Sequence, residues 1–134
     1  MKPIGVAFVG CGEIAQFHAQ ALLKTGSAQV VAVMDRQPEK AQAISKSYGA
    51  RAYRELDLLL NDPDVEAVYI LTRHDSHAVY IRKAMAANKH VFCEKPMALT
   101  LEDALEVLKV AQSSGRFLMV GFNHRWNPAF RWVL

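Results

Sequence analysis

The chain has 134 residues, 51% of them apolar and 22% charged, which is typical of one globular domain and excludes a disordered or collagen-like chain. The 16 Lys and Arg residues against 13 Asp and Glu residues leave a net charge of +3, too small an excess to indicate nucleic-acid binding. No apolar run approaches the roughly 18 residues that a transmembrane helix needs, and no signal peptide is recognisable. Two cysteines are too few for a disulfide framework, so we expect a cytoplasmic protein.

Short apolar runs alternate with segments of helical period, and the first half of the chain contains three of each. Gly26 is expected to end the first helix, and Pro38 occupies a first helical turn, where proline is tolerated. The apolar face predicted for the first helix is formed by Ile14, Phe17, Ala21 and Leu22. The pattern predicts strands at residues 4–9, 29–34 and 51–53 and helices at residues 13–24, 38–48 and 56–60.

The second half repeats the alternation and ends in residues 123–134, which begin an element without completing it. Thr100 is positioned to cap a helix, with Asp103 three residues later, and this helix is expected to end at residues 113–115. Further elements are predicted as strands at residues 65–71, 90–93 and 117–122 and a helix at residues 77–88.

Six strands that are apolar on both faces and alternate with helices predict a parallel sheet with helices on both faces. Right-handed crossovers leave few arrangements for such a chain, and the leading one is the doubly wound α/β sheet of the Rossmann type. Ligands of such sheets bind outside the carboxyl ends of the strands. The residues that follow each strand are therefore the candidates for chemistry.

The sequence Gly-Cys-Gly-Glu-Ile-Ala lies directly between the first strand and the first helix and matches a G-x-G-x-x-A dinucleotide-binding loop. Gly10 permits the tight turn, and Gly12 lets backbone N–H groups approach a pyrophosphate. Glu13 and Ile14 begin the helix whose N-terminus would hold that anion, and Ala15 keeps helix and strand closely packed.

A carboxylate follows the second strand, where it can bond the ribose hydroxyls of a bound dinucleotide. This residue is Asp35, and its negative charge would repel a 2′-phosphate, which favours NAD. Arg36 could pair with such a phosphate, so NADP stays open. An S-adenosylmethionine methyltransferase shares the arrangement of strand, glycine loop and acid, but its sheet normally closes with an antiparallel hairpin, and nothing in this sequence indicates one.

Polar and ionisable residues follow the fourth, fifth and sixth strands, at residues 72–77, 93–96 and 121–128. The most specific of these groups is Glu94-Lys95-Pro96. A lysine at the mouth of a cleft can donate to a substrate hydroxyl or carbonyl, or relay its proton. A solvated surface pair of Glu and Lys is the alternative interpretation.

With these motifs the chain resembles the N-terminal half of the Gfo/Idh/MocA family, which contains glucose–fructose oxidoreductases and inositol dehydrogenases. The resemblance extends over essentially all 134 residues. The matching positions are Gly10, Gly12, Glu13, Ile14, Ala15, His18, Asp35, Thr72, His77, Glu94, Lys95, Pro96, Gly121, Arg125 and Pro128.

The resemblance implies roles for the residues after the fourth and fifth strands. Glu94 and Lys95 would lie beside the nicotinamide ribose and the substrate, with Lys95 polarising the reacting oxygen as the catalytic group. The peptide bond before Pro96 would be cis. Thr72 and His77 would line the nucleotide and nicotinamide side of the cleft.

Arg125, in the segment after the last strand, would lie next to the substrate by the same resemblance. The sequence departs from the family at Arg73 and His74, where the family usually has Pro-Asn. No group of cysteines and histidines has the spacing of a zinc site, so no metal is expected.

Three other features favour structural interpretations. His18 lies on the inner face of the first helix and is expected to be packed and hydrogen-bonded. Cys11 and Cys93 are expected to be buried small hydrophobes. Trp126, Phe130 and Val133 form an apolar stripe that is expected to self-associate if it lacks a partner domain.

The sequence thus predicts a domain of an NAD(P)-dependent oxidoreductase that transfers a hydride between nicotinamide and a secondary alcohol or ketone of a sugar, cyclitol or related substrate. Residues 1–122 would form the dinucleotide-binding domain, and residues 123–134 would begin the connection to a second α/β domain absent from this sequence. Such a chain is expected to bind its cofactor but to turn over little alone. A stand-alone NAD(P)-binding or sensing module is the alternative.

Overall fold

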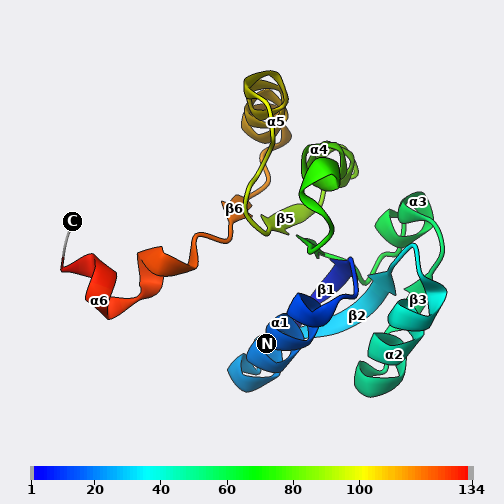
Figure 1. Cartoon of the computed structure of the whole chain (residues 1–134). Coiled ribbons are helices and arrows are strands. Elements are labelled where there is room, and N and C mark those ends of the chain that lie inside the picture. Colours follow the sequence, from blue (N-terminus) through cyan, green and yellow to red (C-terminus); the bar gives the residue numbers. More distant parts are fainter. Residues whose placement is uncertain (1, 133–134) are drawn as a thin grey trace.

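The computed structural model describes residues 2–132, and its centre is one sheet of six strands in the order β3-β2-β1-β4-β5-β6 (Figure 1). Every neighbouring pair is parallel, which confirms the doubly wound α/β sheet expected from the sequence. The strands are β1 (Ile4–Val9), β2 (Ala28–Met34), β3 (Arg51–Tyr53), β4 (Ala67–Ile70), β5 (His90–Cys93) and β6 (Leu118–Val120).

Helices cover both faces of the sheet. They are α1 (Glu13–Thr25), α2 (Pro38–Tyr48), α3 (Leu56–Leu60), α4 (His77–Ala86), α5 (Leu101–Ser114) and α6 (Pro128–Arg131), with two 3-10 turns, η1 (His74–Ser76) and η2 (Asn123–Trp126). The apolar residues of α1 and α2 pack on one face of the sheet, and those of α3, α4 and α5 pack on the other.

The central strand β1 divides its residues between two apolar clusters. Val6 and Phe8 belong to the cluster beneath α1 and α2, and Ala7 and Val9 belong to the cluster beneath α3 and α4. This alternation follows from the two-residue period of a strand, and it buries β1 on both faces. The residues at its carboxyl end therefore start from a fixed position.

The face of α1 that packs on the sheet differs from the predicted one. Ala15 and Ala19 are fully buried, whereas Ile14, Phe17 and Ala21 are exposed, Phe17 by 69%. Two alanines allow the helix to approach the sheet closely behind the glycine loop, and a stripe of larger side chains would hold it away.

Most predicted boundaries agree with the structure, and two strands are shorter than expected. β4 begins after Val65, because the amide of Val65 closes a turn onto the carbonyl of Asp62 (3.2 Å). β6 ends at Val120, where the amide of Phe122 bonds the Val120 carbonyl at 2.8 Å. The predicted helix at residues 77–88 ends at Ala86, and the η1 turn before it was not expected.

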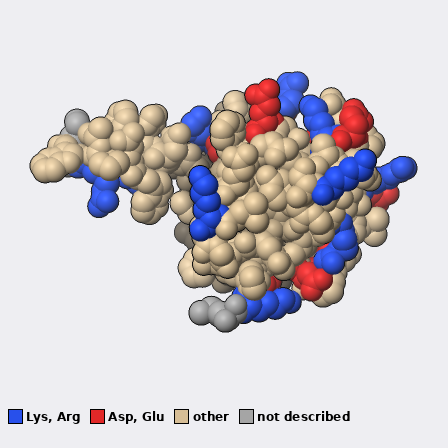
Figure 2. All heavy atoms as spheres, turned by 90° about the horizontal axis from the view of Figure 1, so that it is seen from below, with Lys and Arg blue, Asp and Glu red and all other residues tan. Residues whose placement is uncertain are grey.

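The chain leaves the sheet after β6, and η2 and α6 project from the body of the molecule, as Figure 2 shows most clearly. Trp126 is 64% exposed, Phe130 48% and Trp132 90%. Val133, the third member of the predicted apolar stripe, lies outside the described residues. Within residues 2–132, no helix has the length and apolar character needed to cross a membrane.

Candidate functional site

The carboxyl ends of β1, β2 and β4 meet where the strand order changes direction, the usual ligand position in a doubly wound sheet. A hollow of about 430 Å³ opens there. Five of the predicted site residues line it: Gly10, Gly12, Asp35, Arg36 and Thr72.

The two glycines of the loop differ in their surroundings. Gly10 has a φ of +98°, and a Cβ on it would lie 2.7 Å from both the carbonyl carbon and the oxygen of Leu71. Gly12 has a φ of −76°, which any residue adopts, and a Cβ on it would meet nothing within 4 Å. Gly12 therefore borders open space at the N-terminus of α1, whose first amides have no intrahelical partners.

The carboxylate of Asp35 is held by backbone amides on both of its oxygens. The Cys11 amide donates to Oδ2 at 2.8 Å, and the Gln37 amide donates to Oδ1 at 2.8 Å. These bonds join the end of β2 to the glycine loop. They fix the carboxylate beside the hollow and leave its remaining lone pairs available to a ligand hydroxyl.

Cationic residues line the hollows that border this carboxylate, and none of them forms an ion pair with it among the described residues. Arg36 and Lys40 line the same hollow as Asp35. A neighbouring hollow of about 350 Å³ at the ends of β2 and β3 adds Arg54 to the group. A ligand beside Asp35 would therefore meet one fixed carboxylate and several adaptable cations.

His77 begins α4 and is fully buried, so its side chain does not line the hollow. Its Nδ1 lies 2.7 Å from the Pro96 carbonyl oxygen, and its Nε2 lies 2.9 Å from the Thr72 carbonyl oxygen. A carbonyl oxygen only accepts, so both contacts are hydrogen bonds when each ring nitrogen carries a proton. The ring joins the loops that follow β4 and β5.

Glu94, Lys95 and Pro96 follow β5, next to the hollow but outside its lining. Oε1 of Glu94 lies 2.9 Å from Nε2 of His18, and the Lys95 amide donates to Oε2 at 3.3 Å. The peptide bond between Lys95 and Pro96 is cis, as the family resemblance implies. The Lys95 side chain is exposed and forms no ion pair among residues 2–132.

The two cysteines are free and buried, as expected from the sequence. Burial and, second, the nearby Asp35 carboxylate raise the pKa of the Cys11 thiol to about 12. Burial and, second, the Glu94 carboxylate likewise raise the pKa of the Cys93 thiol to about 12. Neither thiol is therefore suited to act as a nucleophile.

Some predicted site residues lie apart from the hollow. Glu13 and Ile14 are exposed at the start of α1, outside the residues that line it. Arg125 belongs to η2, on the segment that projects from the body.

Other residues line the hollow although the sequence did not single them out as site residues. Gln37 and Lys40 could have been found from the register of the helix that begins at Pro38, because they flank its start. Arg73 and His74, where the sequence departs from the family pattern, also line it.

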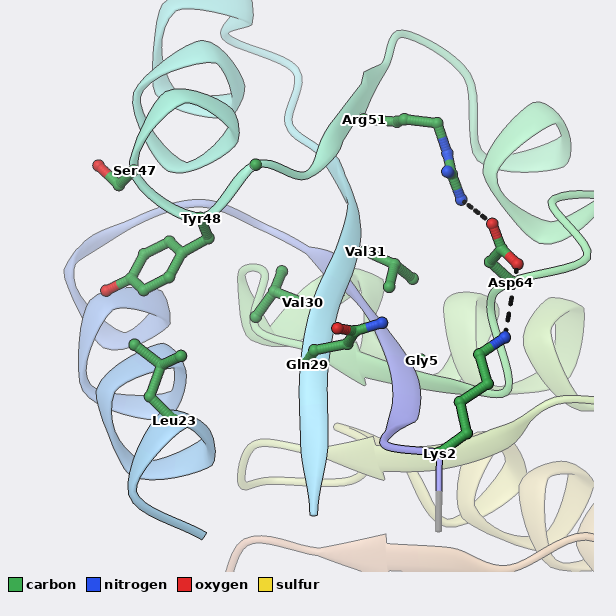
Figure 3. A pocket seen from close by; sticks show the side chains of 11 residues that line it. Lys2, Gly5, Leu23, Gln29, Val30, Val31, Ser47, Tyr48, Arg51 and Asp64 are labelled. Carbon is green, nitrogen blue, oxygen red and sulfur yellow. Dashed lines mark hydrogen bonds and ion pairs between the residues drawn. The ribbon is translucent and has the colours of Figure 1, made fainter. Parts of the chain in front are cut away.

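Another hollow, of about 610 Å³, lies at the opposite edge of the sheet (Figure 3). Its charged side chains satisfy one another, since Lys2 and Arg51 both reach Asp64, at 3.9 and 2.9 Å. It also lies at the amino ends of the strands, where no functional motif occurs. Among the described residues, no three His, Cys, Asp or Glu side chains gather closely enough to hold a metal ion.

Comparison with known proteins gives consistent matches. The GFO_IDH_MocA model, described as an oxidoreductase family with an NAD-binding Rossmann fold, matches residues 4–122. An inositol 2-dehydrogenase of Rhizobium meliloti (strain 1021) is 40% identical over 122 residues, which are 91% of this chain and 37% of that protein.

Two crystal structures extend the comparison. The WlbA dehydrogenase from Bordetella pertussis, in complex with NADH and UDP-GlcNAcA, has a TM-score of 0.94 at 31% identity, over 98% of this chain and 38% of the other. KijD10, a 3-ketoreductase from Actinomadura kijaniata in complex with NADP and TDP-benzene, has a TM-score of 0.89 at 32% identity, over 98% and 41% of the two chains.

The chain spans less than two fifths of the length of the first curated relatives that it matches, 37% and 39% for two inositol 2-dehydrogenases. The part that matches is the part that carries the glycine loop and the strand ends described above. This chain therefore belongs to the Gfo/Idh/MocA oxidoreductase family and contains its NAD-binding Rossmann fold.

Proposed function

We propose that the hollow beside Gly10, Gly12 and Asp35 binds a nicotinamide dinucleotide, with the pyrophosphate over the N-terminus of α1. The supporting observation is the surroundings of Gly12. The fold does not require glycine there, because its φ is ordinary and a Cβ would meet nothing within 4 Å. Close approach of a ligand does require it, because a side chain would fill the space that a pyrophosphate needs.

Asp35 supports NAD as the preferred cofactor. Its carboxylate is fixed by two backbone amides, so it cannot turn away from a 2′-phosphate without losing them. The ribose hydroxyls of NAD can instead donate to its free lone pairs. Positive charge nearby, on Arg36, Lys40 and Arg54, would allow NADP to bind as well, although more weakly than NAD.

Glu94, Lys95 and Pro96 would lie at the nicotinamide end of the cofactor, beside the substrate. Lys95 is the catalytic residue of the proposal, because its ammonium is exposed and unpaired among residues 2–132 and can donate to a reacting oxygen. The buried His77 would contribute indirectly, by holding the Thr72 and Pro96 carbonyls in place.

The bound cofactor supplies hydride chemistry at its nicotinamide ring. The substrate class we propose is a secondary alcohol or ketone of a sugar or cyclitol. Two similar proteins support this substrate class: one is an inositol 2-dehydrogenase, and the other is a dehydrogenase in complex with UDP-GlcNAcA. We assign residues 1–122 to the cofactor domain and residues 123–134, with Arg125, to the connection toward a substrate domain.

The free, buried thiols are consistent with a reducing compartment, the cytoplasm. The exposed aromatic residues Trp126, Phe130 and Trp132 offer a surface through which copies of the chain can associate.

Calorimetric titration of the purified chain with NADH and NADPH tests the proposal. We expect saturable binding of NADH and weaker binding of NADPH, and we expect Asp35→Asn to narrow the difference between them. Absence of heat and of NADH fluorescence change at millimolar concentrations of both cofactors would overturn it.

A further inference from the structure

His18 is the polar residue on the face of α1 that packs against the sheet. The residues nearest to it on that face, Ala15 and Ala19, are fully buried alanines. The His18 ring packs edge-on against Tyr69 of β4 and Phe92 of β5, with centroids 5.6 and 5.0 Å away. Packing alone would be served by an apolar residue at this place.

The polar edge of the ring meets the motif that follows β5. Nε2 of His18 lies 2.9 Å from Oε1 of Glu94, and the two side chains are only 19% and 22% exposed. A partly buried carboxylate takes its orientation from the hydrogen-bond donors around it. His18 supplies one of them from a helix 76 residues away in the sequence.

A second hydrogen bond helps to orient Glu94. Its Oε2 accepts the amide of Lys95 at 3.3 Å. Gly121, which follows β6, also borders the carboxylate: a Cβ there would lie at an ordinary contact distance of 3.4 Å from Oε1, and closer, at 3.0 Å, to the Phe92 ring. The partly buried carboxylate is thus bordered by α1, the loop after β5 and the residue after β6.

We infer that His18 is a positioning residue: its Nε2–H donates to Glu94 and holds the carboxylate in the orientation that accepts the Lys95 amide. This inference rests on the proposed function and deepens it, since it gives the first helix a role at the nicotinamide end as well as at the pyrophosphate. His18 itself touches neither cofactor nor substrate in this scheme.

Two substitutions separate the hydrogen bond from the packing. His18→Gln keeps an N–H donor of similar reach and loses the ring, whereas His18→Phe keeps the ring and loses the donor. We expect His18→Phe to weaken NADH binding by about tenfold and His18→Gln by no more than about twofold. Equal weakening in both variants, or none in His18→Phe, would overturn the inference.

A thermodynamic cycle tests whether His18 acts through Glu94. If it does, adding His18→Phe to Glu94→Ala should cause no further loss of NADH affinity, because the acceptor is already gone. Additive losses would show that the two residues act independently and would contradict the inference. The cycle remains decisive if His18→Phe also lowers stability.

A readout without cofactor keeps this inference distinct from the proposed function. The NMR signal of the Lys95 amide in the unliganded chain should shift, and its hydrogen exchange should accelerate, in His18→Phe but not in His18→Gln. An unchanged Lys95 signal in His18→Phe would refute the positioning role whether or not NADH binds. If the wild-type chain fails to bind NADH but the Lys95 signal still differs between His18→Phe and His18→Gln, only the proposed function is overturned.

Discussion

Gly10 and Gly12 are separated by one residue, and the structure gives them different reasons to be glycine. At Gly10 the reason is conformational and steric, since φ is +98° and a Cβ there would lie 2.7 Å from the Leu71 carbonyl. At Gly12 neither reason applies, and the space beyond it is open. A substitution at Gly10 should therefore affect mainly stability, and a substitution at Gly12 mainly cofactor binding.

Gly10→Ala should destabilise the chain and Gly12→Ala should weaken cofactor binding. We expect Gly10→Ala to lower the free energy of unfolding by at least about 2 kcal/mol. Gly12→Ala should cost less than about 1 kcal/mol, as a poorer helix cap, but lower NADH affinity by at least tenfold. Urea unfolding and calorimetry measure the two effects. The reverse assignment of effects would contradict the account of the loop.

Cys11 and Cys93 should react slowly with thiol reagents in the folded chain. With pKa values raised to about 12, their thiolates are about a thousandfold scarcer at pH 8 than at the ordinary pKa of 9.0. The rate of reaction with a chromogenic disulfide, compared between native and urea-unfolded protein, measures this difference. Equal rates in the two states would show that one of the thiols is accessible and activated.

Individual residues could be predicted from the sequence where a local motif carries them. The glycine loop and Asp35 are examples, because strand, turn and helix succeed one another within a short stretch and fix where the carboxylate lies. The partners of His18 and His77 could not be predicted. Their ring nitrogens contact residues 76, 19 and 5 positions away, and those distances depend on the completed sheet.

At the scale of elements, the short strand β3 depends on a polar cluster around Asp62 rather than on apolar burial. Asp62 is buried and accepts the Arg51 guanidinium at 2.6 and 2.9 Å, with the Tyr53 hydroxyl at 2.8 Å and the Asp64 amide at 2.9 Å. The cluster joins β3 at one edge of the sheet to the turn before β4.

Asp62→Ala should lower the free energy of unfolding by about 1–3 kcal/mol, because it leaves the Tyr53 hydroxyl and the Asp64 amide without their acceptor. The matched control is Asp57→Ala, which removes an exposed contact to Lys83 at 4.0 Å and should cost less than about 1 kcal/mol. Urea unfolding of both variants checks the difference. Equal losses would show that the cluster contributes nothing beyond a surface ion pair.

The same cluster predicts a dependence of stability on pH. Burial by itself raises the pKa of Asp62, but the hydrogen bonds from Asp64, Tyr53 and Arg51 outweigh it and hold the pKa below its usual value. A carboxyl with a lowered folded-state pKa stabilises the fold above its unfolded pKa of about 3.9 and loses that contribution as the pH falls toward the folded value. As the pH falls below about 4, the free energy of unfolding of Asp62→Ala should therefore decrease less steeply than that of the wild type, as measured by urea unfolding at several pH values.

Periodicity predicted which segments become helices but not always which side of a helix packs. In α1 the larger apolar residues Ile14 and Phe17 suggested one face, and the sheet selected Ala15 and Ala19 because close approach needs small side chains. In α5 all three leucines remain exposed, Leu101 by 76%, and only Val107 is fully buried. The face of the sheet on which a helix packs is formed by strands distant in the sequence, so the local pattern of a helix does not predict which of its sides is buried.

At the scale of the whole molecule, the sheet is well packed and the segment after it is not. The strands and α4 place their apolar residues in two continuous clusters, whereas Trp126, Phe130 and Trp132 remain exposed on the projecting segment. Exposed aromatic residues grouped in this way favour association.

Sedimentation velocity should show concentration-dependent self-association of the chain through this segment. Replacing Trp126, Phe130 and Trp132 together by Ser should abolish it, because the apolar contact area is removed. Phe117→Ser is the matched control, since Phe117 is 80% exposed but lies directly before β6, outside the projecting segment. A monomer at every concentration up to the millimolar range would contradict the proposed association.

The central claim is that a nicotinamide dinucleotide binds at the carboxyl ends of β1, β2 and β4, and NMR mapping of a ¹⁵N-labelled chain during titration with NADH tests it most directly. We predict saturable shifts of the amides of Gly12, Arg36 and Arg73, which border the hollow beside Asp35. Gln29 and Arg51, at the opposite edge of the sheet, should not move. Shifts confined to that opposite edge, or none in the glycine loop at saturating NADH, would contradict the account.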